Sequence, residues 1–450
     1  MNMYDSVRNV RRLPAAQVNQ QAGFAQLNVA MRHGHHLLLR MAAIIAFAGA
    51  VLVPAFAGDG REGHWTGTWA AAPAFAQGNT QYSDQTLRFI VHTSLGGSQV
   101  RVRFSNAFGS QPLKIGAAHL ALRDTGAKIL VNSDRSLTFS GRPFIEVPVG
   151  ALVISDPVYL TVPPLVDISV SVYLPGISTA DTSHIFAFQT SFVAPTSGDF
   201  TGAVDLPGAA QTFEWDFLTG VDVLDDDHAA AIVVMGDSIT DGIGSTSDAN
   251  RRWTDVLAKR LLSDRSRNVS VLNEALTGDR ILHPAPDGIS IFGPAALARF
   301  DRDVLGQAGV KYLIVFLGLN DIAQPGVVAP PSEDVSAEDV IAGLQQFIER
   351  AHEKGVLAYG CTLTPFEDSL IAPGFYTPEK EAKREKINRW IRTSGAYDAV
   401  IDFDKVVRDP THPARILPAF DSGDHTHPND AGYKTMGQAI DLSLFVAENY

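Results

Sequence analysis

Cysteine is almost absent from this sequence of 450 residues, and charged residues are few. The one cysteine, Cys361, has no second thiol to pair with, so stability has to come from a packed core rather than from disulfides within the chain. Only 19% of the residues are charged, and 49 acids against 36 Lys and Arg give a formal net charge of -13. Such an acidic chain repels phosphate groups, which disfavours nucleic acids and anionic membrane surfaces as partners. Hydrophobic residues make up 45% of the chain, which is typical of a globular protein.

The sequence also lacks an apolar stretch as long as a transmembrane helix. The most apolar one, residues 41–53, would span about 20 Å as a helix, short of the roughly 30 Å hydrocarbon core of a bilayer. We therefore expect no integral membrane segment in the mature chain.

The same stretch has the flanks of a secretory signal peptide. Arginines precede it, and Ala55 and Ala57 follow it at the positions where a signal peptidase requires small residues. We expect residues 1–57 to be an N-terminal extension with a signal peptide, cleaved after Ala57, and the mature protein to be secreted or periplasmic. The first 30 residues resemble neither a signal nor a folded segment, so either a start at Met31 or an unusually long N-terminal region accounts for them.

Residues 58–225 show the period-two pattern of half-buried β-strands. In the stretch 100–105 every second residue is apolar, and the stretch 168–174 repeats this alternation. The pattern predicts strands that bury one face only. Gly96-Gly97 just before the first stretch indicates a hairpin, and no helical pattern interrupts the region. We predict an antiparallel, jelly-roll-like β-sandwich domain over residues 58–225.

From about residue 229 short apolar runs alternate with helical patterns. The strand candidates are Ala231–Met235, Val269–Leu272, Lys311–Leu317, Gly355–Cys361 and Ala399–Phe403. The helix candidates are Trp253–Leu261, residues near 337–353 and 378–394, and a last helix from about Asp430. This alternation predicts a parallel sheet covered on both faces, with ligands bound beyond the carboxyl ends of the strands. We place this α/β domain at residues 226–450, next to the acidic connector Asp225–Asp227.

A serine stands at the carboxyl end of the first strand of this domain. Gly236-Asp237-Ser238 follows the strand directly, so Ser238 is expected at the rim of the crevice. A serine hydroxyl is a weak nucleophile and needs a base within hydrogen-bond reach. Gly-Asp-Ser also occurs in plain turns and helix caps, so the tripeptide alone is weak evidence of catalysis.

Two further segments end on the same edge of the predicted sheet. Gly278 follows the second strand, and Asn320 follows the third within Gly318-Leu319-Asn320-Asp321. The backbone N–H groups of Gly278 and Ser238, together with the side-chain amide of Asn320, are the donors needed to hold a tetrahedral oxyanion. Each segment taken singly is more typical of a turn, and their shared edge is what favours a common site.

A carboxylate and a histidine stand three residues apart near the end of the sequence. Asp424 and His427 can share one turn, so that the carboxylate accepts a hydrogen bond from one ring nitrogen while the other nitrogen faces the serine. This arrangement fixes the histidine tautomer and stabilises the imidazolium once it forms.

In this order and at these separations, the four segments resemble those of the SGNH, or GDSL, hydrolase family, over about residues 229–450. The resemblance implies a three-layer α/β/α, flavodoxin-like domain with a parallel sheet, and a serine esterase, lipase or acylhydrolase that needs no cofactor. It implies Ser238 as nucleophile, His427 as general base and then acid, and Asp424 as the residue that orients it. It also implies an oxyanion hole made of the three donors named above. The β-rich front half resembles the region that accompanies this domain in secreted members.

We therefore expect a secreted hydrolase that cleaves carboxylic esters, with short acyl chains, through an acyl-enzyme. Small-molecule, polysaccharide and lipid esters all fit, and the sequence indicates neither the alcohol nor the oligomeric state. Transfer of the acyl group to an acceptor other than water, by the same three residues, stays open. A non-catalytic carbohydrate-binding protein is the alternative from another class. It is disfavoured because a pseudoenzyme is expected to lose at least one of Ser238, Asn320 and His427.

Two other kinds of site are disfavoured. Asp424, His425, His427 and Asp430 are possible metal ligands, but no partner motif for a metal site stands elsewhere in the chain. The segment Gly236–Gly244 has neither the Gly-x-Gly-x-x-Gly pattern nor the lysine of a nucleotide-binding loop.

Five other residues have mainly structural explanations. His283 and His425 are weak candidates for substrate contact. Trp253 stands at helical spacing and is expected in the core, as is Cys361 at a strand end. Asn106, in a loop after a β-strand, either caps a turn or reaches toward the crevice.

Overall fold

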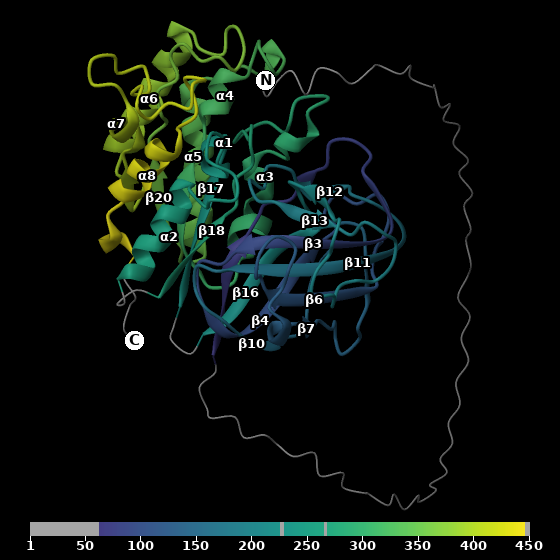
Figure 1. Ribbon diagram of the computed structural model, residues 1–450. Helices are drawn as coiled ribbons and strands as arrows, with labels where there is room; N and C mark the ends of the chain where they lie inside the picture. Colours follow the sequence, from purple (N-terminus) through teal and green to yellow (C-terminus); the bar gives the residue numbers. More distant parts are fainter. Residues whose placement is uncertain (1–62, 226–228, 265–267, 446–450) are drawn as a thin grey trace, which may run out of the picture. The chain divides into compact units, whose positions relative to one another are not determined.

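The computed structural model describes residues 63–225, 229–264 and 268–445 (Figure 1). The expected signal peptide lies outside these residues, as do Asp226 and Asp227 of the acidic connector. Among the residues described, no helix combines the length and the apolar character needed to cross a membrane.

The first half is built from antiparallel sheets, as predicted (Figure 1). One sheet contains β1 (His64–Ala70), β16 (Leu218–Asp225), β4 (Gly97–Ser105), β10 (Val158–Val162) and β9 (Leu152–Ile154). The next, in spatial order, contains β14 (Ala210–Thr212), β13 (Ser191–Val193), β3 (Gln81–His92), β11 (Asp167–Thr179), β6 (Ala117–Leu122) and β7 (Arg135–Ser136). Two small sheets contain β15 (Trp215–Asp216), β12 (Thr182–His184) and β2 (Ala74–Phe75), and β5 (Leu113–Ile115) and β8 (Ile145–Val147). Apolar side chains of the two large sheets, among them Phe104, Val91 and Val170, meet in one buried core.

The expected hairpin at Gly96-Gly97 is wrong. The strands on either side, β3 and β4, belong to different sheets and do not pair with each other. A Cβ at Gly96 would lie 2.7 Å from the carbonyl oxygen of Val162, and one at Gly97 would lie 2.7 Å from that of Leu224. The glycines are therefore explained by close packing of backbone at a corner between two sheets, not by a tight turn.

The prediction that the strands bury one face only is wrong for β11. On β11 the polar Ser169 and Ser171 are as buried as their apolar neighbours. The segment around 194–206 covers this second face, and Arg88 of β3, fully buried beneath it, donates to Ser171 Oγ and to the carbonyl oxygens of Ala127 and Ala203. A buried guanidinium group that satisfies backbone carbonyls produces a polar face that is not a solvent face.

The second half contains one parallel sheet of five strands. Its spatial order is β18 (Val269–Asn273), β17 (Ala230–Gly236), β19 (Val310–Phe316), β20 (Leu357–Cys361) and β21 (Ala399–Ile401). The chain moves one way from β17 to β18 and the other way from β19 to β20, so right-handed crossovers place their helices on opposite faces. The point where the direction reverses, beside β17, is where open α/β sheets bind ligands.

The helices of this half are α1 (Ser238–Asp241), α2 (Trp253–Ser263), α3 (Ala296–Phe300), α4 (Leu319–Ala323), α5 (Ala337–Glu353), α6 (Pro378–Thr393), α7 (Phe403–Val407) and α8 (Asp430–Ala439). Short 3-10 turns and one π turn join some of them. The four predicted helices are present as α2, α5, α6 and α8, whereas the short helices α1, α3, α4 and α7 were not predicted. The last strand is shorter than expected, because Asp402 caps α7 by accepting a hydrogen bond from the Lys405 N–H, which places Phe403 in a helix.

The two halves pack as one compact unit. The Gly67 N–H of β1 donates to Ala308 O at 3.0 Å, and Arg103 of β4 donates to Gly306 O at 2.9 Å. Asp248, between α1 and α2, accepts hydrogen bonds from the backbone and side chain of Thr190. A boundary at residue 226 stays our proposal for the domain division.

Candidate active site

Ser238 stands where the central strand β17 turns sharply into α1. A Cβ at Gly236 would lie 2.3 Å from Thr240 Oγ1, so the turn requires glycine. Asp237 caps α1 by accepting a hydrogen bond from the Ile239 N–H at 3.0 Å. Burial raises the pKa of Asp237 to about 7 in spite of that bond.

A chain of two hydrogen bonds runs from Ser238 through His427 to Asp424. His427 Nε2 lies 2.8 Å from Ser238 Oγ, and His427 Nδ1 lies 2.6 Å from Asp424 Oδ2. An ionised carboxylate only accepts, so Nδ1 carries the proton and Nε2 is left to accept from the serine. Burial alone would raise the pKa of Asp424, but hydrogen bonds from the His427 side chain and the His427 and Thr426 N–H groups outweigh it and lower that pKa. The carboxylate therefore stays ionised beside the imidazole.

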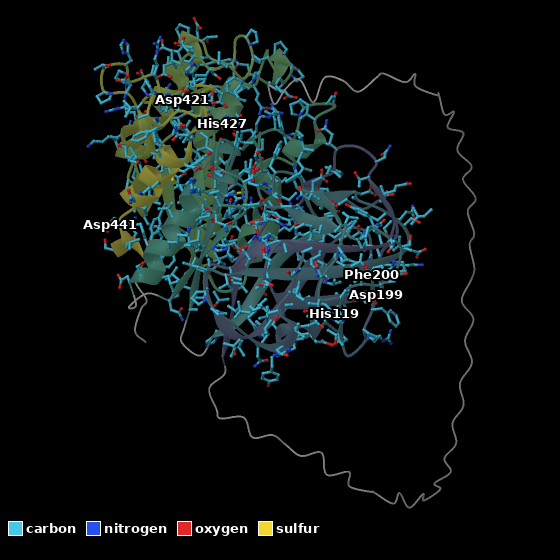
Figure 2. The ribbon with its side chains drawn as sticks, in the orientation of Figure 1. His119, Asp199, Phe200, Asp421, His427 and Asp441 are labelled. Carbon is cyan, nitrogen blue, oxygen red and sulfur yellow. The ribbon has the colours of Figure 1, made fainter. Side chains whose placement is uncertain are left out.

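The loop that carries His427 is fixed against the segment after α1. Asn429 caps α8 through its side-chain oxygen and donates through Nδ2 to Asp421 O at 2.9 Å. Asp430 accepts from the backbone and hydroxyl of Thr246. His427 and Asp421 both lie in this part of the α/β half (Figure 2). The chain separation of 189 residues between Ser238 and His427 is thus bridged by two loops that bind each other.

The two predicted donor segments lie on the same edge and are tied together. Gly278 has φ +80°, and its carbonyl accepts a hydrogen bond from Gln324 Nε2 at 2.7 Å. Asp321, next to Asn320, accepts from the N–H groups of Ile281 and Leu282 at 2.9 and 3.0 Å. Burial raises the pKa of Asp321 to about 6, although both backbone bonds lower it. The loops after β18 and β19 therefore form one hydrogen-bonded unit.

Three donors at this edge of the sheet are available to a ligand. Within residues 63–225, 229–264 and 268–445, no group accepts a hydrogen bond from the Ser238 N–H, the Gly278 N–H or the Asn320 side chain. Ser238 and Asn320 are 9% and 7% exposed. Buried donors without partners are costly unless something fills the site, and a negatively charged oxygen is the group they suit.

Buried charges outside the expected site hold the same loops. Arg299, fully buried on α3, pairs with Asp279, next to Gly278, and with Asp303 at 3.0 Å. Burial raises the pKa of Asp279 to about 7, against the opposing effect of Arg299. Sequence reasoning missed Asp321, Gln324 and Arg299. Irregular loops separate these residues from their partners in the chain, so no periodic pattern relates them. The one available signal was adjacency, because Asp279 stands beside Gly278 and Asp321 beside Asn320.

The structure also places the five other residues that were singled out. Trp253 and Cys361 are buried in the core, as expected. Asn106 caps a turn, because its Nδ2 donates to the carbonyls of Gln111 and Val147. His425 pairs with Asp421 and its side chain is 45% exposed, and His283 is half-buried. Substrate contact by these two histidines stays a prediction.

In the part of the chain that the structure describes, no three metal-ligating side chains form a cluster.

The second half of the chain is similar to known proteins. The family described as GDSL-like Lipase/Acylhydrolase matches residues 232–440. The match gives residues 232–440 as a GDSL-like lipase/acylhydrolase domain, which supports a hydrolase of ester bonds.

Similar solved structures include two enzymes of low sequence identity. An acetyl xylan esterase from Geobacillus stearothermophilus is 15% identical, with 49% of this chain and 97% of that chain covered and a TM-score of 0.36. A GDSL-like lipase from Bacteroides thetaiotaomicron is also 15% identical, with 48% and 87% covered and a TM-score of 0.33. No curated protein matches significantly.

We predict that Gly278→Ala disrupts the loop around Gly278 that follows β18, which we call the donor loop. Its Cβ would lie 2.4 Å from the Phe292 ring, in addition to the strain of a positive φ. Overpacking costs about 1–3 kcal/mol and the left-handed conformation about 1–2 kcal/mol. We expect both costs to lower the free energy of unfolding, measured by denaturant titration, and kcat to fall at least about tenfold as the N–H moves.

Gly288→Ala is the matched control. Gly288 lies in the same connection with φ +84° but has nothing within 4 Å of the added Cβ. It should show the conformational cost alone, with kcat close to that of the wild type. Equal effects of the two substitutions would contradict a role for the Phe292 contact.

Proposed function

We propose that the protein is a secreted serine esterase that cleaves carboxylic esters with short acyl chains through an acyl-enzyme. The observation that carries this proposal is the pair of hydrogen bonds, 2.8 and 2.6 Å, from Ser238 through His427 to Asp424. A serine joined in this way to a base and an orienting carboxylate has the geometry of an activated nucleophile.

In the proposed mechanism, Ser238 Oγ attacks the ester carbonyl carbon while its proton passes to His427 Nε2. The carbonyl oxygen becomes an oxyanion, held by the N–H groups of Ser238 and Gly278 and by the Asn320 amide. The intermediate collapses as the protonated His427 donates its proton to the leaving alcohol oxygen. Water, deprotonated by the same nitrogen, then attacks the acyl-enzyme. His427 returns that proton to Ser238 Oγ as the acid is released, which regenerates the free serine. Asp424 stays ionised throughout and stabilises the imidazolium.

Restricted access to the serine supports a small acyl group. Ser238 is 9% exposed, His427 is 2% exposed, and the Phe292 ring lies against the donor loop at Gly278. The proposal is tested with a series of 4-nitrophenyl esters of increasing acyl length, run beside acetylated polysaccharides. Highest kcat/KM on long acyl chains would contradict a short-chain esterase and favour a lipase.

Export is proposed from the sequence pattern of residues 41–57. We predict that the protein recovered from the culture medium or periplasm begins at Gly58, because Ala55 and Ala57 satisfy the signal peptidase. Amino-terminal sequencing of that material measures the position. An intact N-terminus in exported protein, or retention of all of the protein in the cell, would contradict cleavage at this site.

We predict that Ser238→Ala abolishes both ester hydrolysis and covalent labelling by an organophosphonate, because no other side chain is proposed to form the acyl bond. Labelling is read by mass spectrometry of the intact chain. Ser422→Ala, in the loop that carries His427, is the control and should keep both. A label on another serine in Ser238→Ala would contradict the assignment.

We predict that Asn320→Ala lowers kcat about 10²–10³-fold with little change in KM, since the amide meets the oxygen only when it becomes an oxyanion. Steady-state kinetics on a small aryl ester separate the two parameters. A raised KM at unchanged kcat would instead mean that Asn320 binds the ground state of the substrate.

A further inference from the structure

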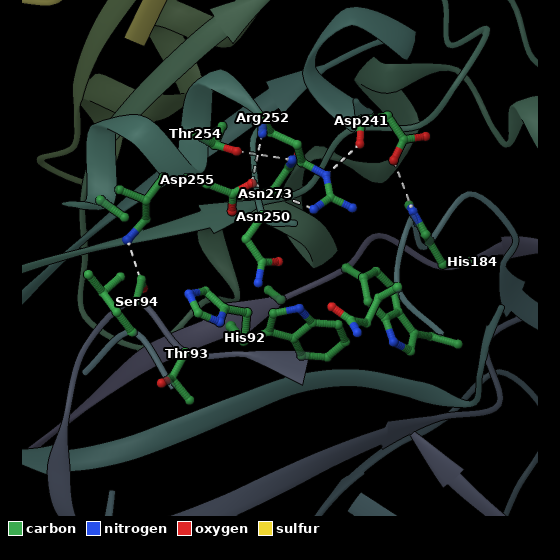
Figure 3. Close-up of a pocket in the computed structure, with 18 residues that line it drawn as sticks. His92, Thr93, Ser94, His184, Asp241, Asn250, Arg252, Thr254, Asp255 and Asn273 are labelled. Carbon is green, nitrogen blue, oxygen red and sulfur yellow. Dashed lines mark hydrogen bonds and ion pairs between the residues drawn. The ribbon is translucent and has the colours of Figure 1, made fainter. Parts of the chain in front are cut away.

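His184 is the residue through which the β-rich half reaches the helix that carries Ser238. It ends β12, and its Nε2 lies 3.1 Å from Oδ1 of Asp241, the last residue of α1. The two residues are 5% and 3% exposed. Figure 3 shows the His184 ring directed at the Asp241 carboxylate, with the cavity between the two halves beside them.

The hydrogen-bond partners define where the protons are. His184 Nδ1 lies 3.0 Å from Ala72 O, and a carbonyl oxygen only accepts, so Nδ1 donates. A hydrogen bond between Nε2 and Oδ1 then needs a second proton, on either the imidazole or the carboxyl group. The second oxygen of Asp241, Oδ2, accepts from the N–H and the hydroxyl of Thr277 at 3.0 and 2.6 Å.

One carboxylate therefore joins both sides of the proposed active site. Asp241 closes the single turn of helix that begins with Ser238, and Thr277 immediately precedes Gly278. The position of Asp241 thus determines how far the serine lies from the Gly278 N–H. Trp215, whose ring centroid is 5.5 Å from that of His184, holds the imidazole from the β-rich side.

We propose that His184 is a positioning residue for ester hydrolysis, which sets the distance between Ser238 and the Gly278 N–H by anchoring Asp241. The inference rests on the proposed function, because it assigns His184 a part in the same oxyanion geometry. It gives the β-rich half a role in the chemistry of small substrates, which a half that only shields the hydrolase domain would not have.

Two substitutions at His184 separate anchoring from packing. The amide nitrogen of Gln occupies the place of Nε2 and can still donate to Asp241, whereas that of Asn occupies the place of Nδ1 and reaches only Ala72 O. The cavity beside the pair, of about 50 Å³ and partly polar, can admit water in place of the lost ring atoms. We expect His184→Asn to lower kcat on a small aryl ester by about 10- to 100-fold with KM within about twofold, because a displacement near 1 Å costs about that much. His184→Gln should keep more than about half of the wild-type kcat.

The matched control is another His–Asp pair, placed in the β-rich half. His119 Nδ1 lies 3.0 Å from Asp134, and His119 lies far from His427 (Figure 2). His119→Gln removes that contact, because the amide nitrogen of Gln follows Nε2, and it should leave kcat unchanged. Hydrogen–deuterium exchange gives a readout that is independent of catalysis. His184→Asn should speed exchange of the amides around 276–279, and His119→Gln should not.

A third variant tests the link from the hydrolase side. Thr277→Val keeps the shape of the side chain but removes the hydroxyl donated to Asp241, and we expect kcat to fall about 3- to 10-fold with His184 intact. This variant decides the matter if His184→Asn fails to fold. Wild-type kcat in His184→Asn or in Thr277→Val would overturn the proposal. Equal losses of kcat in His184→Asn and His184→Gln would also overturn it. If the wild type hydrolyses no ester, the proposed function fails, while unchanged exchange around 276–279 in His184→Asn would overturn the anchoring itself.

Discussion

The turn from β17 into α1 is the constraint on which the rest of the site depends. Because Gly236 has no side chain, Thr240 packs directly on the strand end, and α1 begins with Ser238 exactly one residue after the capping Asp237. The turn is also bound from outside, since Asn273 at the end of β18 donates to Thr240 O at 2.8 Å. Ser238 is thereby fixed relative to the neighbouring strand, and the loops after the other strands bring their groups to it.

Sequence periodicity predicts the parts of this structure that depend on burial, and it fails where polar groups are buried. The five parallel strands were predictable because they are short continuous apolar runs, and the long helices because each has one apolar stripe facing a core. Ser238 and Asn320 were predictable as neighbours because parallel strands end on one edge, whereas His427 was placed beside Ser238 by its spacing from Asp424 and by the resemblance to the SGNH family. The burial of the second face of β11 was not predictable, because the sequence pattern is the same whether its serines face water or lie beneath Arg88. Neither was His184, whose link to Asp241 joins residues 57 positions apart without any local pattern.

Buried ion pairs rather than regular secondary structure give the donor loops their shape. Arg299 is buried and pairs with the carboxylates of Asp279 and Asp303, and its loss would leave Asp279 buried without a counter-charge, whereas Asp303 would keep its ion pair with Arg302. Breaking such a pair costs about 3–5 kcal/mol, whereas a surface ion pair contributes about 0–1 kcal/mol. We expect a loop held in this way to keep its conformation when a ligand binds. That preorganisation is what electrostatic stabilisation of an oxyanion requires, because donors that must first reorient give up part of their effect.

The β-rich half covers the edge strand β18 of the parallel sheet. β18 is an edge strand, and an uncovered edge presents free backbone groups that favour aggregation. Here the Val271 N–H of β18 donates to Ser94 Oγ of the β-rich half at 3.1 Å, and β1 lies so close that a Cβ on Gly67 would be 2.6 Å from Leu272. The opposite edge strand, β21, is only three residues long and needs less cover. Since β18 leads directly to Gly278, the cover that protects the sheet edge also holds the strand from which the donor loop emerges.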